Sequence, residues 1–449
     1  MSSLCTVLFR LCGVLLVLST HGNMALAAPP DFDSLLQEVK PGKVVTIPDG
    51  THVMKGFPTL RGVTGTAEQP AVLRAENRGM AVIAGACGLV FKDCAHVVIE
   101  GLVFENDADQ QCIRLENCRH VRVTRNTFRP TERKKPRHWE HWVTVEGARS
   151  SRNRLDHNLF DRKVNRGSPL FIRGDDAALV CSRHDRVDHN HFRDVVDAGR
   201  ENGHETLRTG GNDLGASGRS SFTLIEDNLF ERCSGEDEIL SLKSSDNIVR
   251  NNTLINCRGA ICMRLGSRST ATGNVIIATE DRPGFGGIKL LGFDHRVTGN
   301  FFAGLTGSRH EAPFSIFPGL HDTETTEAIR DRYDDNTASA ATRCQIAGNT
   351  WLDCSPLQIG LEKPDKQWRH LPRDCSFEGN RILRTRRSSK PLVIAGLVTG
   401  LRAGGNLACV PCPRPDAGWA GWFSWQNELP KGWGRPRPLR ASDVGPESP

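Results

Sequence analysis

An asparagine followed two positions later by an aromatic or aliphatic residue recurs along most of this 449-residue chain. The three closest intervals are 24, 22 and 26 residues, and wider intervals of 32, 38 and 49 residues leave room for inserted loops. Alternating apolar residues usually precede each unit, so short strands at this period predict a parallel β-solenoid in which each coil covers its neighbour. The units are Asn126–Phe128, Asn158–Phe160, Asn190–Phe192, Asn228–Phe230, Asn252–Leu254, Asn274–Ile276, Asn300–Phe302 and Asn349–Trp351.

The repeated asparagines are expected to stack in the bends as a ladder of side-chain amides. Cysteines follow the same repeat, since Cys233, Cys257 and Cys354 each lie five residues after a repeated asparagine. Small buried residues that stack between coils are the favoured interpretation. Disulfide bonds are the alternative, because an exported chain can oxidise its cysteines.

The first 27 residues have the composition of a cleaved secretory signal. They combine a single Arg10, an apolar core from Leu11 to Leu18 and an Ala25–Ala27 exit. This core is far shorter than the roughly 20 residues that span a bilayer, and no later segment is long enough either. We therefore expect a secreted or periplasmic protein whose mature domain occupies residues 28–449 and has no membrane span.

Both ends of the expected solenoid carry segments suited to covering an open sheet edge. Phe32, Leu35, Leu36 and Val39 have the i, i+3, i+4, i+7 spacing of a helix, which predicts an N-terminal capping helix. Residues from about 410 to 449 are rich in tryptophan and proline and are expected to fold over the last coil. Their tryptophans are Trp419, Trp422, Trp425 and Trp433.

The formal charge of +6 suits a polyanionic ligand but does not identify one. No nucleic-acid-binding motif is present in the sequence, and no protein partner can be inferred from it. The basic stretch Arg133–Arg137 and the long segment Thr306–Arg343 are the expected elaborated loops, where function tends to concentrate.

Two carboxylates, a lysine and an arginine lie within thirty residues of one another. Glu236 and Glu238 are two apart, so in a strand both project from one face, where hard oxygen ligands can hold calcium. Lys243 and Arg264 are 21 residues apart, close to one coil, which makes them lateral neighbours on successive coils about 5 Å apart. Alone, the two glutamates would read as a solvated strand face.

The orientation of these side chains follows from strand alternation, with one exception. Ile261, Met263 and Leu265 form the inward set, which turns Arg264 outward. Strict alternation places Lys243 on the opposite face from Glu238, so a bend or β-bulge must intervene between them.

Several separated motifs resemble the chondroitinase B and alginate lyase family, polysaccharide lyase family 6. They are Gly235–Ser244, the spacing from Lys243 to Arg264, Asn202–Arg208 and Arg264–Gly266, and the likeness extends to the tail at Pro438–Pro446. The resemblance implies an all-β fold, a right-handed single-stranded parallel β-helix, which is also the handedness expected of parallel crossovers.

The resemblance also implies residue roles. It implies calcium held by Asn202, Glu236 and Glu238, with Lys243 as the Brønsted base and Arg264 as its partner acid. Glu205 competes with Asn202 as a ligand and otherwise joins Arg208 and Arg309 as a substrate-binding residue. The chain departs from the family at Leu265, where the usual Arg-His-Gly motif has histidine.

The function implied is calcium-dependent cleavage of a 1,4-linked uronate polymer by β-elimination, which leaves a 4,5-unsaturated sugar. Calcium on the sugar carboxylate would neutralise the charge that grows as C5 loses its proton. A nearby cation and Arg264 disfavour the ammonium form of Lys243, as a base requires. Arg264 is a poor proton donor and is expected to stabilise charge. Alginate is the first choice of substrate and dermatan or chondroitin sulfate the second.

Three other interpretations stay open from sequence. Lys243 and Arg264 would form surface salt bridges with Glu236 or Glu238 if they had no catalytic role. A glycoside hydrolase on the same scaffold would use the two glutamates as acid and nucleophile, and would leave Lys243 without a role. A non-catalytic sugar-binding β-helix would bind the polymer without turnover.

Overall fold

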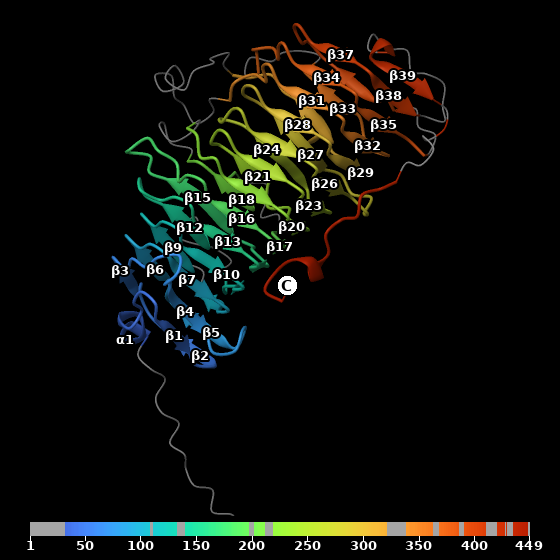
Figure 1. The fold of residues 1–449 in the computed structure, drawn as a ribbon. Coiled ribbons are helices and arrows are strands. Elements are labelled where there is room, and N and C mark those ends of the chain that lie inside the picture. Colours follow the sequence, from blue (N-terminus) through green and yellow to red (C-terminus); the bar gives the residue numbers. More distant parts are fainter. Residues whose placement is uncertain are drawn as a thin grey trace, which may run out of the picture.

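Three long parallel sheets form the walls of a single winding chain (Figure 1). The computed structural model describes residues 32–107, 111–132, 140–196, 202–211, 219–320, 338–361, 368–385, 390–409, 420–426, 428 and 434–447. The predicted signal peptide, the basic stretch 133–137 and two of the tryptophans, Trp419 and Trp433, lie outside these residues. None of the helices described is long and apolar enough to cross a membrane.

Each turn of the chain contributes one strand to each sheet in order, so strands three apart in sequence are neighbours, except at the C-terminal end, where β39 pairs with β38. Sheet 1 has 13 described strands: β1 (Val44–Ile47), β4 (Ala71–Ala75), β7 (Val97–Glu100), β10 (Arg122–Thr124), β13 (Arg154–Asp156), β16 (Arg186–Asp188), β19 (Leu224–Glu226), β22 (Ile248–Arg250), β25 (Thr270–Thr272), β28 (Arg296–Thr298), β31 (Gln345–Ala347), β34 (Ser376–Glu378) and β37 (Arg402–Gly404).

Sheet 2 follows the first bend of each coil. It has 14 described strands: β2 (Gly50–Val53), β5 (Ala81–Gly85), β8 (Val103–Asn106), β11 (Thr127–Phe128), β14 (Leu159–Asp161), β17 (His191–Arg193), β20 (Leu229–Glu231), β23 (Thr253–Ile255), β26 (Val275–Ile277), β29 (Phe301–Ala303), β32 (Thr350–Leu352), β35 (Arg381–Leu383), β38 (Asn406–Cys409) and β39 (Phe423–Gln426).

Sheet 3 completes each coil and carries the predicted site. Its 12 described strands are β3 (Thr59–Arg61), β6 (Leu89–Lys92), β9 (Ile113–Glu116), β12 (Val143–Glu146), β15 (Leu170–Gly174), β18 (Leu207–Thr209), β21 (Glu238–Leu242), β24 (Gly259–Met263), β27 (Phe285–Leu290), β30 (Phe314–Ile316), β33 (Leu357–Ile359) and β36 (Val393–Ala395). All pairings between neighbouring strands of the sheet, such as β18 with β21 and β21 with β24, are parallel. The predicted all-β parallel β-helix is therefore confirmed.

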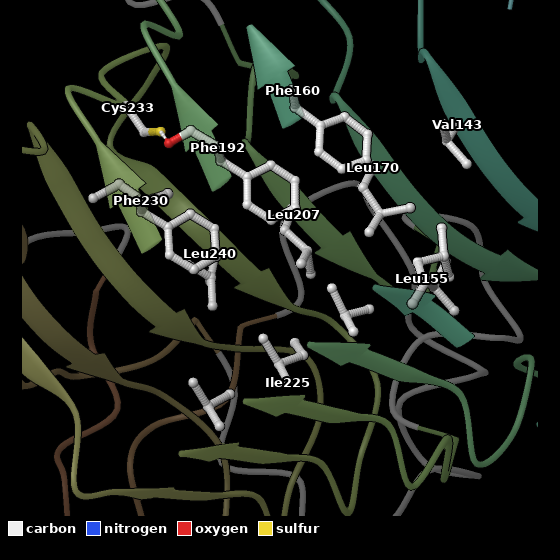
Figure 2. Packing of buried hydrophobic residues seen from close by; sticks show 14 of the residues in the cluster. Val143, Leu155, Phe160, Leu170, Phe192, Leu207, Ile225, Phe230, Cys233 and Leu240 are labelled. Atoms are coloured by element: carbon white, nitrogen blue, oxygen red, sulfur yellow. Dashed lines mark hydrogen bonds between the residues drawn. The ribbon is translucent and has the colours of Figure 1, made fainter. Parts of the chain in front are cut away.

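The interior is filled by like residues stacked from coil to coil. Phe128, Phe160, Phe192 and Phe230 form a column in which neighbouring ring centroids are 4.5 to 4.8 Å apart. Figure 2 shows three of these rings beside the apolar residues of the other two sheets. Because these phenylalanines are the aromatic members of the repeated units, the repeat marks the core of each coil.

The predicted asparagine ladder is confirmed. The Asn228 amide donates to Asn252 Oδ1 at 3.0 Å, and Asn252 donates to Asn274 Oδ1 at 3.0 Å. Asn228 Oδ1 also accepts the backbone N–H of Asn190 at 2.9 Å. All eight predicted members take part, and Asn380 and Asn406 extend the ladder to the last coils.

The residue before each ladder asparagine sets the bend between sheets 1 and 2. It has a positive φ in every rung, between 53° and 65°, a region that costs least for glycine. The early rungs use Arg125, His157, His189, Asp227 and Asn251, whereas the later ones all use glycine, at Gly273, Gly299, Gly348, Gly379 and Gly405.

The cysteines in the described part of the chain are all free. Cys233 and Cys257 are buried on adjacent coils, where the backbone N–H of Cys233 donates to Cys257 Sγ at 3.4 Å. Their place in the stack confirms the favoured interpretation of small buried stacking residues.

Both ends carry covering segments, but the prediction that residues from about 410 to 449 fold over the last coil is confirmed only for 420–426 and is wrong for 434–447. The capping helix α1 (Phe32–Gln37) buries Phe32 and Leu36 against the first coil. At the other end β39 adds a strand to sheet 2, with Trp422 and Trp425 packed on the core. The described residues also include three short 3-10 helices, η1 (Arg309–Glu311), η2 (Ala420–Trp422) and η3 (Ala441–Asp443).

The C-terminal tail was not predicted to return along the solenoid, but it does (Figure 1). The backbone N–H of Leu439 donates to Thr253 Oγ1 at 2.9 Å, and that of Gly445 donates to His189 O at 2.8 Å. Arg78 and Arg125 both donate to the Pro446 carbonyl at 2.9 Å. The tail therefore ties the late coils to the early ones.

The ladder can be tested by Asn228→Ala. This change removes the side-chain acceptor of the buried Asn190 N–H and the amide that donates to the carbonyls of Val187 on the preceding coil and Glu226 on its own coil, and a buried group left unpaired costs about 1–3 kcal/mol. We expect a fall of several degrees in the thermal midpoint. Gln345→Ala, which removes an exposed amide, is the control and should change little. A midpoint for Asn228→Ala equal to that of the control would show that the ladder is not a main source of stability.

Candidate active site

Six of the predicted residues, Glu205, Arg208, Glu236, Glu238, Lys243 and Arg264, come together at the outward face of sheet 3, on three successive coils. Arg208 pairs in register with Ser241, and Leu242 pairs with Met263. Lys243 and Arg264 directly follow this last pair, so they are lateral neighbours one coil apart, as their spacing predicted. Met263 is fully buried in the core, which turns Arg264 outward.

The predicted β-bulge lies between Glu238 and Lys243. Glu238 pairs with Ala260 and Leu240 with Ile261, so Ile239 is an extra residue in β21. Ile239, Leu240 and Leu242 all belong to the core. The bulge therefore brings Glu238 and Lys243 to the same face, where the Ser241 hydroxyl donates to Glu238.

Two glycines of the motifs are required by close contact between coils. A Cβ on Gly235 would lie 2.4 Å from the His204 carbonyl oxygen, and one on Gly266 would lie 2.0 Å from that of Ser244. Leu265, between Arg264 and Gly266, has a φ of 59°, which is strained for a leucine. The Gly266 N–H donates to the Arg264 carbonyl at 2.6 Å, so a tight turn fixes the backbone just after the arginine.

Three carboxylates form the centre of the site. Glu205, Glu236 and Glu238 each place one oxygen within 4.8 Å of the others. Their exposed fractions are 0%, 7% and 6%. Glu205 lies just before β18, Glu236 in the loop before β21, and Glu238 at the start of β21, so stacking of two coils assembles the group.

Two oxygens of this group have no hydrogen-bond partner among the described residues. They are Glu205 Oε2 and Glu236 Oε1, and both are enclosed. The other oxygen of Glu236 accepts the backbone N–H of Gly203 at 2.7 Å and that of His204 at 3.3 Å. Enclosed carboxylate oxygens without donors are costly unless a cation binds them, so this donor set fits a hard divalent ion.

The two predicted catalytic cations are paired with the group. Lys243 Nζ donates to Glu205 Oε1 at 2.7 Å, and one guanidinium nitrogen of Arg264 donates to Glu238 Oε1 at 2.7 Å. These are not the surface salt bridges of the non-catalytic interpretation, because the Lys243 side chain is 2% exposed and that of Arg264 17%.

Charge is unevenly shared among the three carboxylates. Burial raises the pKa of Glu236 to about 9, and the charges of Glu205 and Glu238 add to this effect. Burial also opposes ionisation of Glu205, but Lys243 and Arg208 outweigh it and lower the pKa of Glu205 to about 2. Glu236 therefore holds a proton at neutral pH when no cation is bound.

The pair of Glu238 and Arg264 stays ionised. Burial raises the pKa of Glu238, but Arg264 first and then Lys243 outweigh it and hold the value far below the usual range. Burial lowers the pKa of Arg264, and the adjacent Glu238 reverses this and raises it above the usual range. Arg264 is thus held as a cation, which suits stabilisation of charge rather than donation of a proton.

The remaining predicted residues lie around this centre. The Asn202 residue is exposed, its backbone carbonyl accepts from Arg166, and the next residue donates to Glu236. Arg208 is buried over the Phe171 ring, 4.4 Å from the centroid. Arg309 is exposed at the start of η1.

A second group was missed by sequence reasoning. Asp237, His310 and Glu311 each place a potential ligand atom within 4.8 Å of the others, and His310 Nε2 lies 2.9 Å from Asp237 Oδ2. The 73 residues between Asp237 and His310 give no motif spacing that would have linked them. This contact fixes η1, and hence Arg309, against the loop that carries Glu236.

Two cavities among the described residues lie away from this centre. One of about 590 Å³ is lined by residues that include Glu280, Asp353, Cys354 and Arg384, on the turns that follow sheet 2. It contains none of the predicted site residues. The chemistry of the carboxylate group, rather than cavity size, therefore locates the site.

Comparison with known structures points to one group of enzymes. The chain matches a PL6 family alginate lyase, AlyGC, with 25% identity and a TM-score of 0.73, covering 88% of this chain and 52% of that one. The chain thus spans about half the length of that relative. A mannuronic acid specific family 6 lyase from human gut microbiota matches with 23% identity, a TM-score of 0.67, and 90% and 91% coverage.

A PL6 alginate lyase in complex with a trisaccharide matches with 19% identity, a TM-score of 0.75, and coverage of 93% and 92%. At these identities the two latter structures support the fold alone. No curated protein sequence matches the chain.

The family itself is settled by a sequence comparison that is independent of these structures. The model of the family described as Chondroitinase B matches residues 27–385, which is most of the chain. The motifs Asn202–Arg208, Gly235–Ser244 and Arg264–Gly266 all lie within the matched residues. This chain belongs to the chondroitinase B family of polysaccharide lyases.

Proposed function

We propose that the protein is a calcium-dependent lyase that cleaves a 1,4-linked uronate polymer, alginate in the first place, by β-elimination. The observation that carries this proposal is the buried carboxylate group with two unpartnered oxygens, flanked by Lys243 and Arg264 from successive coils. The matched structures are those of alginate lyases, which favours alginate. The chondroitinase B description of the family keeps dermatan or chondroitin sulfate as the alternative substrate.

Glu205, Glu236 and Glu238 would hold the calcium ion, and Asn202 at the exposed rim stays a predicted fourth ligand. The chemistry that Ca²⁺ supplies there when bound is Lewis acidity toward the carboxylate of the sugar. Arg208, which is buried one coil before Ser241, and Arg309 on η1 are the residues that we propose bind neighbouring acidic groups of the polymer.

Lys243 is the proposed base. As the neutral amine, its nitrogen would take the proton from C5, the electron pair of that bond would form the C4–C5 double bond, and the C4–O bond would break. Arg264, held as a cation by Glu238, would donate hydrogen bonds to the departing oxygen, which takes its proton from water. A hydrolase mechanism on Glu236 and Glu238 gives Lys243 no such role.

We further propose that residues 1–27 are removed on export, as their composition predicts. The lyase family acts on a polymer too large to enter a cell intact, which supports an extracytoplasmic site of action. N-terminal sequencing of the protein recovered outside the cytoplasm is expected to begin near residue 28. A full-length protein retained in the cytoplasm would contradict export.

The base can be tested by Lys243→Ala. With alginate, the wild type is expected to release unsaturated products that absorb in the ultraviolet, and the variant to lose at least about a hundredfold in kcat, the usual contribution of a general base. If the alanine variant folds poorly, Lys243→Gln provides the same test, because its amide keeps a hydrogen-bond donor for Glu205 but cannot act as a base.

The matched control is Lys92→Ala, which removes a lysine on the same outward face, paired with Glu116 far from the site. It should keep near wild-type rates. A Lys243→Ala variant as active as this control would refute the proposed base, and products without a double bond would refute elimination.

Calcium binding should be linked to loss of the Glu236 proton. Because the folded protein holds that proton with a pKa of about 9, binding at pH 7 should release close to one proton, and affinity should rise up to tenfold per pH unit until about pH 9. Calorimetry in buffers of different ionisation enthalpy measures the release. Binding that is independent of pH, or equally tight in Glu236→Gln, would contradict the proposed ligand set.

The same shift predicts how the metal-free protein responds to pH. The pKa of Glu236 is higher in the folded protein than its ordinary value of 4.5, so its stabilising effect is complete below about pH 4.5 and is lost as pH rises to about 9. Thermal midpoints of the wild type should therefore fall toward pH 9 more steeply than those of Glu236→Gln. Parallel curves for the two proteins would show that Glu236 titrates normally.

A further inference from the structure

A second outward cation lies on the coil that follows Arg264. Lys289 is part of β27, and its neighbours Ile288 and Leu290 are fully buried in the core, so the lysine faces outward. In register it stands between Cys262 on the preceding coil and Ser315 on the next. Because Cys262 pairs with Ser241, Lys289 lies about 10 Å along the axis from Ser241, two strand spacings away.

Lys289 is buried without a partner for its charge. Its exposed fraction is 8%, and among the described residues its ammonium group makes neither a hydrogen bond nor an ion pair. The contact that it does make is with the Phe317 ring, 5.7 Å from nitrogen to centroid. Burying an ammonium group without an anion costs free energy. A residue at this position would therefore be apolar or paired with an acidic side chain, unless a ligand supplies the anion.

Its neighbours do not supply the missing acceptor. The Ser315 hydroxyl is enclosed and has no hydrogen-bond partner in the described chain. Glu238 is near enough to interact electrostatically with Lys289, but its two oxygens are already bound by Arg264 and Ser241. The charge of Lys289 therefore remains available to an anion that arrives on this face.

An apolar cluster packs beside Lys289. Phe317 packs edge-to-face on Trp368 with centroids 5.3 Å apart, and Cys262, Leu291 and Leu361 belong to the same cluster on the outward side of the sheet. Phe317 is 2% exposed and Leu291 1%, so the cluster offers no open surface for a ligand. It holds the Lys289 side chain in a fixed position, and the ammonium group is what an arriving anion would meet.

We propose that Lys289 binds the carboxylate of the uronate unit next to the one that loses its proton, and so forms a subsite one coil beyond Arg264. This inference rests on the proposed function, because it requires a polymer with an acidic group on successive units. Lys289 is then a substrate-binding residue that fixes the register of the polymer and takes no part in proton transfer.

The test compares Lys289→Met with Lys289→Arg. Methionine keeps the length and the packing on Phe317 but removes the charge, whereas arginine keeps the charge. For alginate oligosaccharides we expect methionine to raise KM about tenfold or more, the usual effect of losing a charge-assisted hydrogen bond, with kcat changed less than about threefold. The Lys289→Arg variant should keep a KM close to that of the wild type. Lys92→Met is the control and should leave KM unchanged.

Two measurements separate a subsite from a structural role. Without substrate, Lys289→Met should keep or raise the thermal midpoint, since it removes a buried charge that has no partner. In a Lys243→Gln background, which prevents turnover, calorimetry should show weaker binding of a uronate tetrasaccharide when Lys289 is also changed to methionine. A lowered midpoint with unchanged affinity would overturn the subsite, as would a fall in kcat larger than the rise in KM.

The outcomes distinguish this inference from the function on which it rests. Suppose that the wild type releases unsaturated products but that Lys243→Gln binds the tetrasaccharide equally well with and without Lys289→Met. That result would overturn the subsite and leave the lyase proposal standing. If Lys243→Gln does not bind uronates and the wild type releases no unsaturated product, both proposals are overturned.

Discussion

The site depends on the parallel in-register stacking of coils. One strand spacing of about 4.8 Å separates residues that are 21 to 38 positions apart in the sequence, and this brings Glu205, Lys243 and Arg264 into contact range. The spacing is maintained by buried amide hydrogen bonds in the ladder and by the column of phenylalanine rings. Register errors of one residue would turn each functional side chain into the core, so the same interactions that stabilise the fold also fix the site.

The second constraint is the burial of unlike charges in one small volume. Three carboxylates face Lys243 and Arg264, and the carboxylate left over, Glu236, takes up a proton when no cation is present. A protein selected only for stability would not bury such a group, since replacing it with apolar residues usually costs nothing. The strained turn at Leu265 also indicates a functional site, because backbone strain is concentrated at such sites. It lies beside glycines that allow neighbouring coils to come into close contact.

Much of this was predictable from sequence because a solenoid translates sequence spacing directly into distance. The repeat gave the coils and the ladder, alternation turned Arg264 outward, and failure of alternation between Glu238 and Lys243 required the bulge that β21 contains. What could not be predicted comes from contacts between segments with no fixed spacing. The approach of His310 to Asp237 and the return of the C-terminal tail are of this kind. Lys289 was missed for another reason, because its lack of a partner is visible only once its neighbours are placed.

The central claim is that a cation held by buried carboxylates lies between an amine and a guanidinium from successive coils, in position to receive a uronate. A crystal structure of Lys243→Gln with calcium and an alginate oligosaccharide tests it most directly. The account predicts one calcium ion bound by Glu205, Glu236 and Glu238, with a sugar carboxylate on the ion and C5 of that sugar facing residue 243. A calcium ion bound elsewhere, or a sugar chain that lies away from sheet 3, would contradict it.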